Sequence, residues 1–257
     1  MLPSVIKNRI SEDNMFRDPS TKKRFKTLYK MSPYLYDSTH TIIERTKNVL
    51  FQLKNIYLIK SPRIYADPEI VAEYDKVYTK LEQNTKKLAG KLSCPVEWAI
   101  SKPAGLVIYA IIRKTMPKTV LETGVANGAS TYIILSALNK NKKGHLVSTE
   151  IRKDVGQLLI GISKRRWRLM VGNPKTVFRD TLKRLGKVDI FLHDSDHSYK
   201  TMMYEYTTVF DKLSRNGLIL SDDVNGNAAF MQFSQHFKTK PVLIRSRERV
   251  FGVLYAS

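Results

Sequence analysis

The sequence predicts an α/β protein: a mostly parallel sheet with helices on both faces, preceded by a helical N-terminal region. From residue 101 onward, short runs rich in β-branched residues alternate with helix-like segments, which is typical of a parallel sheet. One of these runs ends in a turn with glycines at positions 124 and 128. Residues 1–100 show helical periodicity interrupted by prolines instead. We therefore divide the chain into an N-terminal helical extension, residues 1–100, and a sheet domain, residues 101–257.

The chain of 257 residues is long enough for one large domain, or for one domain with a substantial appendage. No apolar run approaches the roughly 18 residues of a membrane span. The N-terminus has no long apolar core and no small-residue cleavage site, so we expect no secretory signal. The single cysteine, Cys94, excludes an intramolecular disulfide and fits a reducing compartment. These features predict a cytoplasmic protein.

The formal net charge is +21, and the densest basic patch lies at residues 164–168. A surplus of this size favours polyanions, so nucleic acid, an anionic membrane surface or a phosphorylated substrate are candidate partners. The alternative is a lysine-rich, solvated surface without a specific partner.

The N-terminal region has two apolar stripes with helical spacing. The first predicts a helix over about 39–59, and the second predicts a helix that starts at Asp67-Pro68-Glu69 and reaches Leu81. The first 30 residues are polar and basic, which favours a mobile arm. We interpret this region as a lid, a substrate-binding region or an oligomerisation region, so a homo-oligomer is a candidate assembly.

Seven strands are predicted in the sheet domain, and a helix from Ala104 to Arg113 leads into the first of them. The last two strands are joined by a short polar turn and predict a terminal hairpin, which places one antiparallel strand in the sheet. The predicted strands are 118–123, 145–150, 167–171, 188–193, 217–222, 241–246 and 249–255.

The first strand and the turn after it predict a ligand site. The strand ends at Glu122 and runs into a turn in which Gly124 and Gly128 let the backbone approach a ligand closely. The next helix begins there, and its free N–H groups attract an anionic group. An ordinary tight turn between a strand and a helix is the alternative.

The second predicted strand ends in another carboxylate, Glu150. Parallel neighbouring strands end at the same edge, so Glu150 is expected beside the glycine turn, where it can accept hydrogen bonds from ribose hydroxyls. A dinucleotide dehydrogenase uses the same arrangement, but an acid at Glu122 argues against it because that position is normally apolar.

Acidic residues also follow the fourth and fifth predicted strands. Asp194 ends the fourth, in the run Asp194-Ser-Asp-His-Ser-Tyr199, and Asp222 and Asp223 end the fifth. Carboxylates that converge at one edge repel one another unless a cation compensates them. Oxygen ligands of this kind suit Mg²⁺, or another divalent cation such as Mn²⁺ or Ca²⁺.

The pattern acid-x-Gly-x-x-x-Gly, followed by an acid that closes the next strand, resembles class I S-adenosylmethionine-dependent methyltransferases. Asp-Ser-Asp-His-Ser-Tyr and Ser-Asp-Asp-Val narrow the resemblance to the metal-dependent O-methyltransferases that include macrolide-sugar O-methyltransferases and cephalosporin-hydroxylase-like proteins. More distantly, the chain is similar to catechol O-methyltransferases. The resemblance covers residues 101–257 and implies a Rossmann-like seven-stranded sheet.

The resemblance also implies roles for individual residues. The cation would be held by Asp194, Asp222 and Asp223, and His197 would be the general base beside Asp194. The residues implied for S-adenosylmethionine are Glu122, Gly124, Ala126, Gly128, Ser130, Glu150 and Asn173. His193 and Asp196 depart from the family pattern, and we interpret His193 as structural and Asp196 as a candidate helix cap.

Purely structural roles are the alternatives for the same residues. Asp222 or Asp223 is alternatively a cap of the following turn, and His197 a hydrogen-bonded structural residue. Asn173 is alternatively part of a surface turn.

The function implied is an S-adenosylmethionine-dependent, Mg²⁺-dependent O-methyltransferase acting on a hydroxyl of a small molecule, a sugar or a lipid-linked glycan. The basic surface suggests an RNA methyltransferase as an alternative, although the Asn/Asp-Pro-Pro-aromatic motif of base N-methylation is absent. A non-catalytic basic module that binds nucleic acid or anionic membrane is the third hypothesis.

Overall fold

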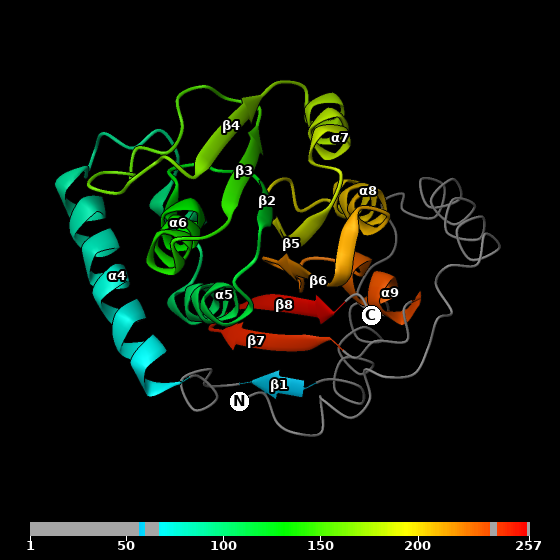
Figure 1. Ribbon diagram of the computed structural model, residues 1–257, viewed down its shortest axis with the longest axis horizontal. Helices are drawn as coiled ribbons and strands as arrows, with labels where there is room; N and C mark the ends of the chain where they lie inside the picture. Colours follow the sequence, from blue (N-terminus) through cyan, green and yellow to red (C-terminus); the bar gives the residue numbers. More distant parts are fainter. Residues whose placement is uncertain (1–56, 60–66, 237–240, 256–257) are drawn as a thin grey trace.

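The computed structural model describes residues 57–59, 67–236 and 241–255 (Figure 1). Its strands are β1 (Tyr57–Ile59), β2 (Thr119–Thr123), β3 (His145–Glu150), β4 (Trp167–Val171), β5 (Val188–His193), β6 (Leu213–Ser221), β7 (Val242–Ser246) and β8 (Arg249–Tyr255). Its helices are α4 (Pro68–Lys87), the short 3-10 helix η4 (Val96–Trp98), α5 (Lys102–Thr115), α6 (Ala129–Asn141), α7 (Pro174–Leu185), α8 (Tyr199–Phe210) and α9 (Ala229–His236).

The strands form one mixed sheet in the order β1-β7-β8-β6-β5-β2-β3-β4. Strand β8 runs antiparallel to both of its neighbours, β6 and β7, and the other pairs are parallel. All seven predicted strands are therefore present, and the predicted hairpin supplies the antiparallel strand. This is the Rossmann-like sheet that the sequence implied.

One strand was not predicted. Residues 57–59 form β1, which pairs in parallel with Val242–Ile244 of β7, so the sheet has eight strands within the described residues. The prediction of a helix over 39–59 is wrong at these residues, and its remainder lies outside the described residues, as does the expected N-terminal arm. Tyr57-Leu58-Ile59 has strand-forming side chains, and pairing satisfies backbone groups along β7 that would otherwise form a sheet edge.

Helices cover both faces of the sheet, as predicted. Along β5, Ile190 and Leu192 face the core shared with α4, α5 and α6, whereas Phe191 faces the core shared with α7, α8 and α9. This alternation follows from the two-residue period of a strand. Figure 1 shows the two groups of helices on opposite sides of the strands. The carboxyl ends of the parallel strands are left free of helix at one edge, where the site lies.

Helix α4 begins where the sequence predicts, with Asp67 as its cap and Pro68 in its first turn. The Asp67 carboxylate accepts a hydrogen bond from the Glu69 N–H at 3.1 Å. The helix packs on α5 and α6, and the Tyr74 hydroxyl, buried in that contact, donates to the Lys102 carbonyl at 2.9 Å. The described part of the N-terminal region thus shares the core of the sheet domain. The division of the chain at residue 100 stays a prediction.

An ion pair adds to the contact between α4 and α5. The Arg113 Nε lies 2.8 Å from a Glu73 carboxylate oxygen, and both side chains are mostly buried. The Tyr109 hydroxyl and the Lys140 ammonium also contact this carboxylate. Hydrogen bonding to Arg113 is the main reason that the pKa of Glu73 falls to about 2.

Across residues 67–236 and the two short described segments, none of the helices has both the length and the apolar character needed to cross a membrane.

Candidate active site

The turn between β2 and α6 has the unusual backbone that its glycines predict. Gly124 has φ +80°, and Gly128, the N-cap of α6, has φ +91°. A Cβ on Gly124 would lie 2.0 Å from the backbone oxygen of Asp194. Ala126, between the two glycines, also adopts a positive φ of +46°. The glycine at 124 is therefore required by the close approach of the chain after β5.

Glu122 lies beneath this turn, fully buried. Its carboxylate accepts hydrogen bonds from the hydroxyls of Ser130 at 2.7 Å, Thr131 at 2.8 Å and Ser148 at 2.6 Å. Burial raises the pKa of Glu122, and the three hydroxyl contacts oppose that rise. The sequence implied that Glu122 and Ser130 contact the cofactor; in the structure their side chains bind each other and fasten the start of α6 to the sheet.

Glu150 lies at the same edge of the sheet as the glycine turn, as predicted from the order of the strands. One of its oxygens accepts from the N–H groups of Val125 at 2.9 Å and Ala126 at 3.2 Å. The other accepts from the N–H of Ile151 at 2.7 Å. The carboxylate thereby joins the end of β3 to the glycine turn.

Two adjoining cavities of about 550 and 540 Å³ open at this edge. Both are lined by Trp98, Ala126 and the segment 194–196, so we treat them as one cleft. The first also contains His197, Asp223 and Ser130; the second also contains Gly124, Glu150, Ile151, Pro174 and Val177. The cleft thus brings the glycine turn and the acids after β5 and β6 to one place.

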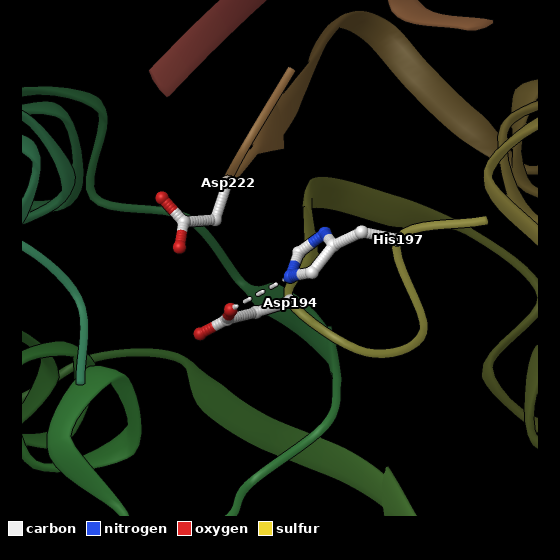
Figure 2. Close-up of side chains that lie close together, drawn as sticks. All are labelled: Asp194, His197 and Asp222. Atoms are coloured by element: carbon white, nitrogen blue, oxygen red, sulfur yellow. Dashed lines mark ion pairs between the residues drawn. The ribbon is translucent and has the colours of Figure 1, made fainter. Parts of the chain in front are cut away.

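Asp194 and His197, which line the first half of this cleft, come together with the buried Asp222 (Figure 2). One ligand atom from each lies within 4.8 Å of those of the other two. The pairing of His193 with Ser221 in neighbouring strands places Asp194 beside Asp222. The His197 Nε2 is 4.0 Å from an Asp194 oxygen. Two carboxylates and an imidazole therefore face a common point.

The electrostatics of these three residues follow from their burial. Burial, with repulsion from Asp223, raises the pKa of Asp222 to about 6, and burial and Asp222 together raise the pKa of Asp194. Burial also lowers the pKa of His197 to about 4. At pH 7 the imidazole is neutral, and a cation would stabilise the charged form of the two carboxyl groups.

Arg249, which the sequence analysis missed, compensates part of that charge. From the start of β8, its guanidinium donates to both oxygens of Asp223, at 2.8 and 3.1 Å, and to Asp222. Asp223, which was implied as a cation ligand, therefore binds Arg249 instead. The backbone φ of Asp223 is +48°. The only sequence signal was a basic residue at the start of the strand that pairs with β6.

The sequence analysis also missed a contact between His193 and Glu205. The Nδ1 of buried His193 is 2.6 Å from the carboxylate of Glu205, which also accepts from the hydroxyls of Thr123 and Ser195. His193 is therefore structural, as expected. Within the described ranges, neither its Nε2 nor the Nδ1 of His197 has a hydrogen-bond partner, although both are buried. An acid on the apolar face of α8 was the signal for Glu205.

Asn173 and Asp196 lie just before the helices α7 and α8. The Asn173 side chain accepts from the Thr176 N–H at 3.4 Å as the cap of α7, and it does not line the cleft. Its neighbours Pro174 and Val177 do so in its place. The N-cap of α8 is Ser198, and not Asp196 as expected; Asp196 accepts from the Ser198 N–H at 3.1 Å and so holds that cap in place. The role of Asn173 in binding the cofactor stays a prediction.

Comparisons with known proteins identify a matching domain and a similar fold. Residues 121–224 match a family described as a methyltransferase domain. The fold is similar to TomG, an O-methyltransferase from Streptomyces achromogenes solved with S-adenosylmethionine, at 16% identity and TM-score 0.54, covering 86% of this chain and 100% of TomG. It is also similar to an O-methyltransferase from Bacillus cereus solved with S-adenosylhomocysteine, at 13% identity and TM-score 0.52, covering 69% and 90%.

A third similar structure is the methyltransferase PaMTH1 from Podospora anserina with S-adenosylhomocysteine, at 18% identity and TM-score 0.50, covering 86% of this chain and 100% of PaMTH1. No curated protein sequence matches the chain.

The chain thus contains a region, residues 121–224, that matches a methyltransferase domain, and the strand order and the glycine turn agree with that match. That region contains every residue that the sequence assigned to the cofactor or the cation.

Proposed function

We propose that the protein is an O-methyltransferase that uses S-adenosylmethionine and a divalent cation to methylate a hydroxyl of a small molecule, a sugar or a lipid-linked glycan. Mg²⁺ is the favoured candidate for the cation. The observation that carries this proposal is the convergence of Asp194 and His197, which line the cleft that also contains Gly124 and Glu150, with the buried Asp222. The TomG and Bacillus cereus proteins, which share the fold, are described as O-methyltransferases.

The residues present fit a divalent cation. Asp194 and Asp222 supply carboxylate oxygens, the ligands that Mg²⁺ prefers, and burial raises the pKa of each, so a cation would stabilise their charged form. Asp223 is left to Arg249, so the proposed ligand pair is Asp194 and Asp222. A bound divalent cation lowers the pKa of a hydroxyl that it contacts.

The protein's own groups would do the remaining chemistry. His197 is neutral at pH 7 because burial depresses its pKa, so its ring can accept the proton of the acceptor hydroxyl. Its Nε2 lies 4.0 Å from oxygens of Asp194 and Asp223, which stabilise the imidazolium that results. S-adenosylmethionine would supply the methyl group to the acceptor oxygen and leave as S-adenosylhomocysteine, and the main contribution of the fold would be to align donor and acceptor in the cleft.

The two halves of the cleft suit the two parts of the reaction. The second half, with Glu150, Ile151 and Val177, combines a carboxylate with apolar walls, which suits a nucleoside. The first half, which contains Asp194 and His197, suits the methyl acceptor. We assign the nucleoside of S-adenosylmethionine to the second half accordingly.

Transfer of labelled methyl groups from S-adenosylmethionine to a panel of phenols, sugars, glycolipids and RNA tests this proposal. We expect transfer to a hydroxylated small molecule or glycan that stops with a chelator and returns with Mg²⁺. Equal transfer with and without chelator contradicts the cation, and transfer to RNA alone contradicts the acceptor class. Nucleic acid, membrane and homo-oligomer partners stay predictions.

A further inference from the structure

Arg249 joins two parts of the cleft that are distant in sequence. In addition to its contacts with Asp222 and Asp223, its guanidinium donates to the carbonyl oxygens of Glu97 at 3.2 Å and Ala99 at 2.9 Å. Its side chain is 29% exposed, so these contacts are shielded from much of the solvent. One side chain thus binds two carboxylates and two backbone carbonyls.

The two carbonyls belong to the segment 95–100, which we name the wall segment. It contains η4 and lines the first half of the cleft over most of its length, and its Trp98, 60% exposed, lines both halves. Paired hydrogen bonds between Asn127 and the backbone of Cys94 hold the chain just before this segment. Arg249 holds the middle of the segment, and thereby connects the wall segment to Asp222 and Asp223.

Arg249 also changes the charge that a cation meets. When Asp194, Asp222 and Asp223 are all ionised they carry three negative charges, and the guanidinium compensates one of them. A divalent cation beside Asp194 and Asp222 then leaves the cluster neutral overall, but it is repelled by the guanidinium that shares Asp222. This repulsion would weaken cation binding and favour a cation position on the side of Asp194 and His197.

We propose that Arg249 is a positioning residue that fixes the wall segment to the acid cluster and lowers the affinity of that cluster for a divalent cation. Only the second part rests on the proposed function, because the contacts with Glu97 and Ala99 do not involve a cation.

Hydrogen–deuterium exchange of the full chain, without cofactor or cation, tests the first part. Arg249→Met removes all the contacts, and Arg245→Met is the matched control, because Arg245 is exposed on the same hairpin and its Nε contacts the Arg247 carbonyl. We expect faster exchange in the wall segment for Arg249→Met and no change for the control. Unchanged exchange in Arg249→Met overturns this part.

Mn²⁺ binding followed by electron paramagnetic resonance tests the second part. We expect Arg249→Met to bind Mn²⁺ about tenfold more tightly than the wild type, equivalent to about 1.4 kcal/mol of repulsion removed. Arg249→Lys keeps the charge but cannot bridge all five oxygens, so we expect it to have nearly wild-type Mn²⁺ affinity with faster exchange in the wall segment. Unchanged or weaker Mn²⁺ binding by Arg249→Met overturns this part.

The outcomes separate this inference from the proposed function. If neither the wild type nor Arg249→Met binds Mn²⁺, the cation role of Arg249 and the cation dependence of the reaction both fail. The exchange data still decide whether Arg249 fixes the wall segment.

If Arg249→Met does not fold, exchange in Arg249→Lys decides whether Arg249 fixes the wall segment. Arg249→Lys preserves the charge, so Mn²⁺ binding by this variant that is much tighter than that of the wild type overturns the charge argument.

Discussion

The backbone oxygen of Asp194 lies against Gly124 so closely that a Cβ on the glycine would meet it at 2.0 Å. The turn that we assign to the cofactor and the segment that carries the proposed cation ligand are thus packed against each other without an intervening side chain. Movement of one must displace the other.

Gly124→Ala should therefore destabilise the protein and disturb the site together. A positive φ costs an alanine about 1 kcal/mol, and relief of the clash adds to it, so we expect a loss of more than about 2 kcal/mol in the free energy of unfolding. Urea denaturation measures it. Gly161→Ala is the control, because Gly161 has φ +71° but no atom near its absent Cβ. Equal losses in both variants would show that the contact with Asp194 is unimportant.

Glu150→Ala should weaken the binding of S-adenosylhomocysteine by tenfold or more, about 1.4 kcal/mol, because it removes the carboxylate proposed for the ribose and frees the N–H groups of Val125 and Ala126. Calorimetric titration measures the dissociation constant. Glu82→Ala, an exposed change on α4, is the control. An unchanged dissociation constant in Glu150→Ala would remove the ribose assignment.

The strands could be predicted from sequence because each is a local apolar run with a polar end. Strand β1 was missed because three residues carry too little pattern to distinguish a strand from the end of a helix. The convergence of Asp194 with Asp222 also followed from strand order alone.

Side-chain direction could not be predicted in the same way. Glu122 and Glu150 both end strands, but the Glu122 carboxylate on β2 is buried and accepts hydrogen bonds from three hydroxyls, whereas Glu150 reaches the cleft. Arg249 meets Asp223 across 26 residues, through the register of the β8 pairing with β6, which the sequence does not specify.

Asp222→Asn should abolish cation-dependent methyl transfer and leave the binding of S-adenosylhomocysteine within about twofold of the wild type, since the substitution removes charge from the cation site and keeps the side-chain shape. Asp180→Asn, on the exposed surface of α7, is the control. Full cation-dependent activity in Asp222→Asn would contradict the proposed ligand pair.

Cation binding should also weaken in acid. Because the pKa of Asp222 is raised to about 6 by burial, a proton occupies this carboxylate below that pH and competes with the cation. We expect the Mn²⁺ affinity to be constant above about pH 7 and to fall up to about tenfold per pH unit below about pH 6. Electron paramagnetic resonance between these values measures it. A pH-independent affinity down to about pH 5 would contradict the role of Asp222.

Glu73→Gln should destabilise the contact between α4 and α5 by about 1–2 kcal/mol at neutral pH, because it removes the charge that pairs with Arg113. The folded-state pKa of Glu73 is lowered to about 2 from 4.5, so this stabilisation is complete above pH 4.5 and is lost as the pH falls towards 2. The difference in the free energy of unfolding between wild type and variant should shrink over that range. A difference that stays constant would exclude the charge as its cause.

The most direct measurement is calorimetric titration of S-adenosylmethionine and S-adenosylhomocysteine into the full chain, followed by Mg²⁺ into the cofactor-loaded wild type and into Asp222→Asn. The account predicts micromolar cofactor binding in both proteins and Mg²⁺ binding in the wild type alone. Failure of the wild type to bind either cofactor, or equal binding of Mg²⁺ by both proteins, would contradict it.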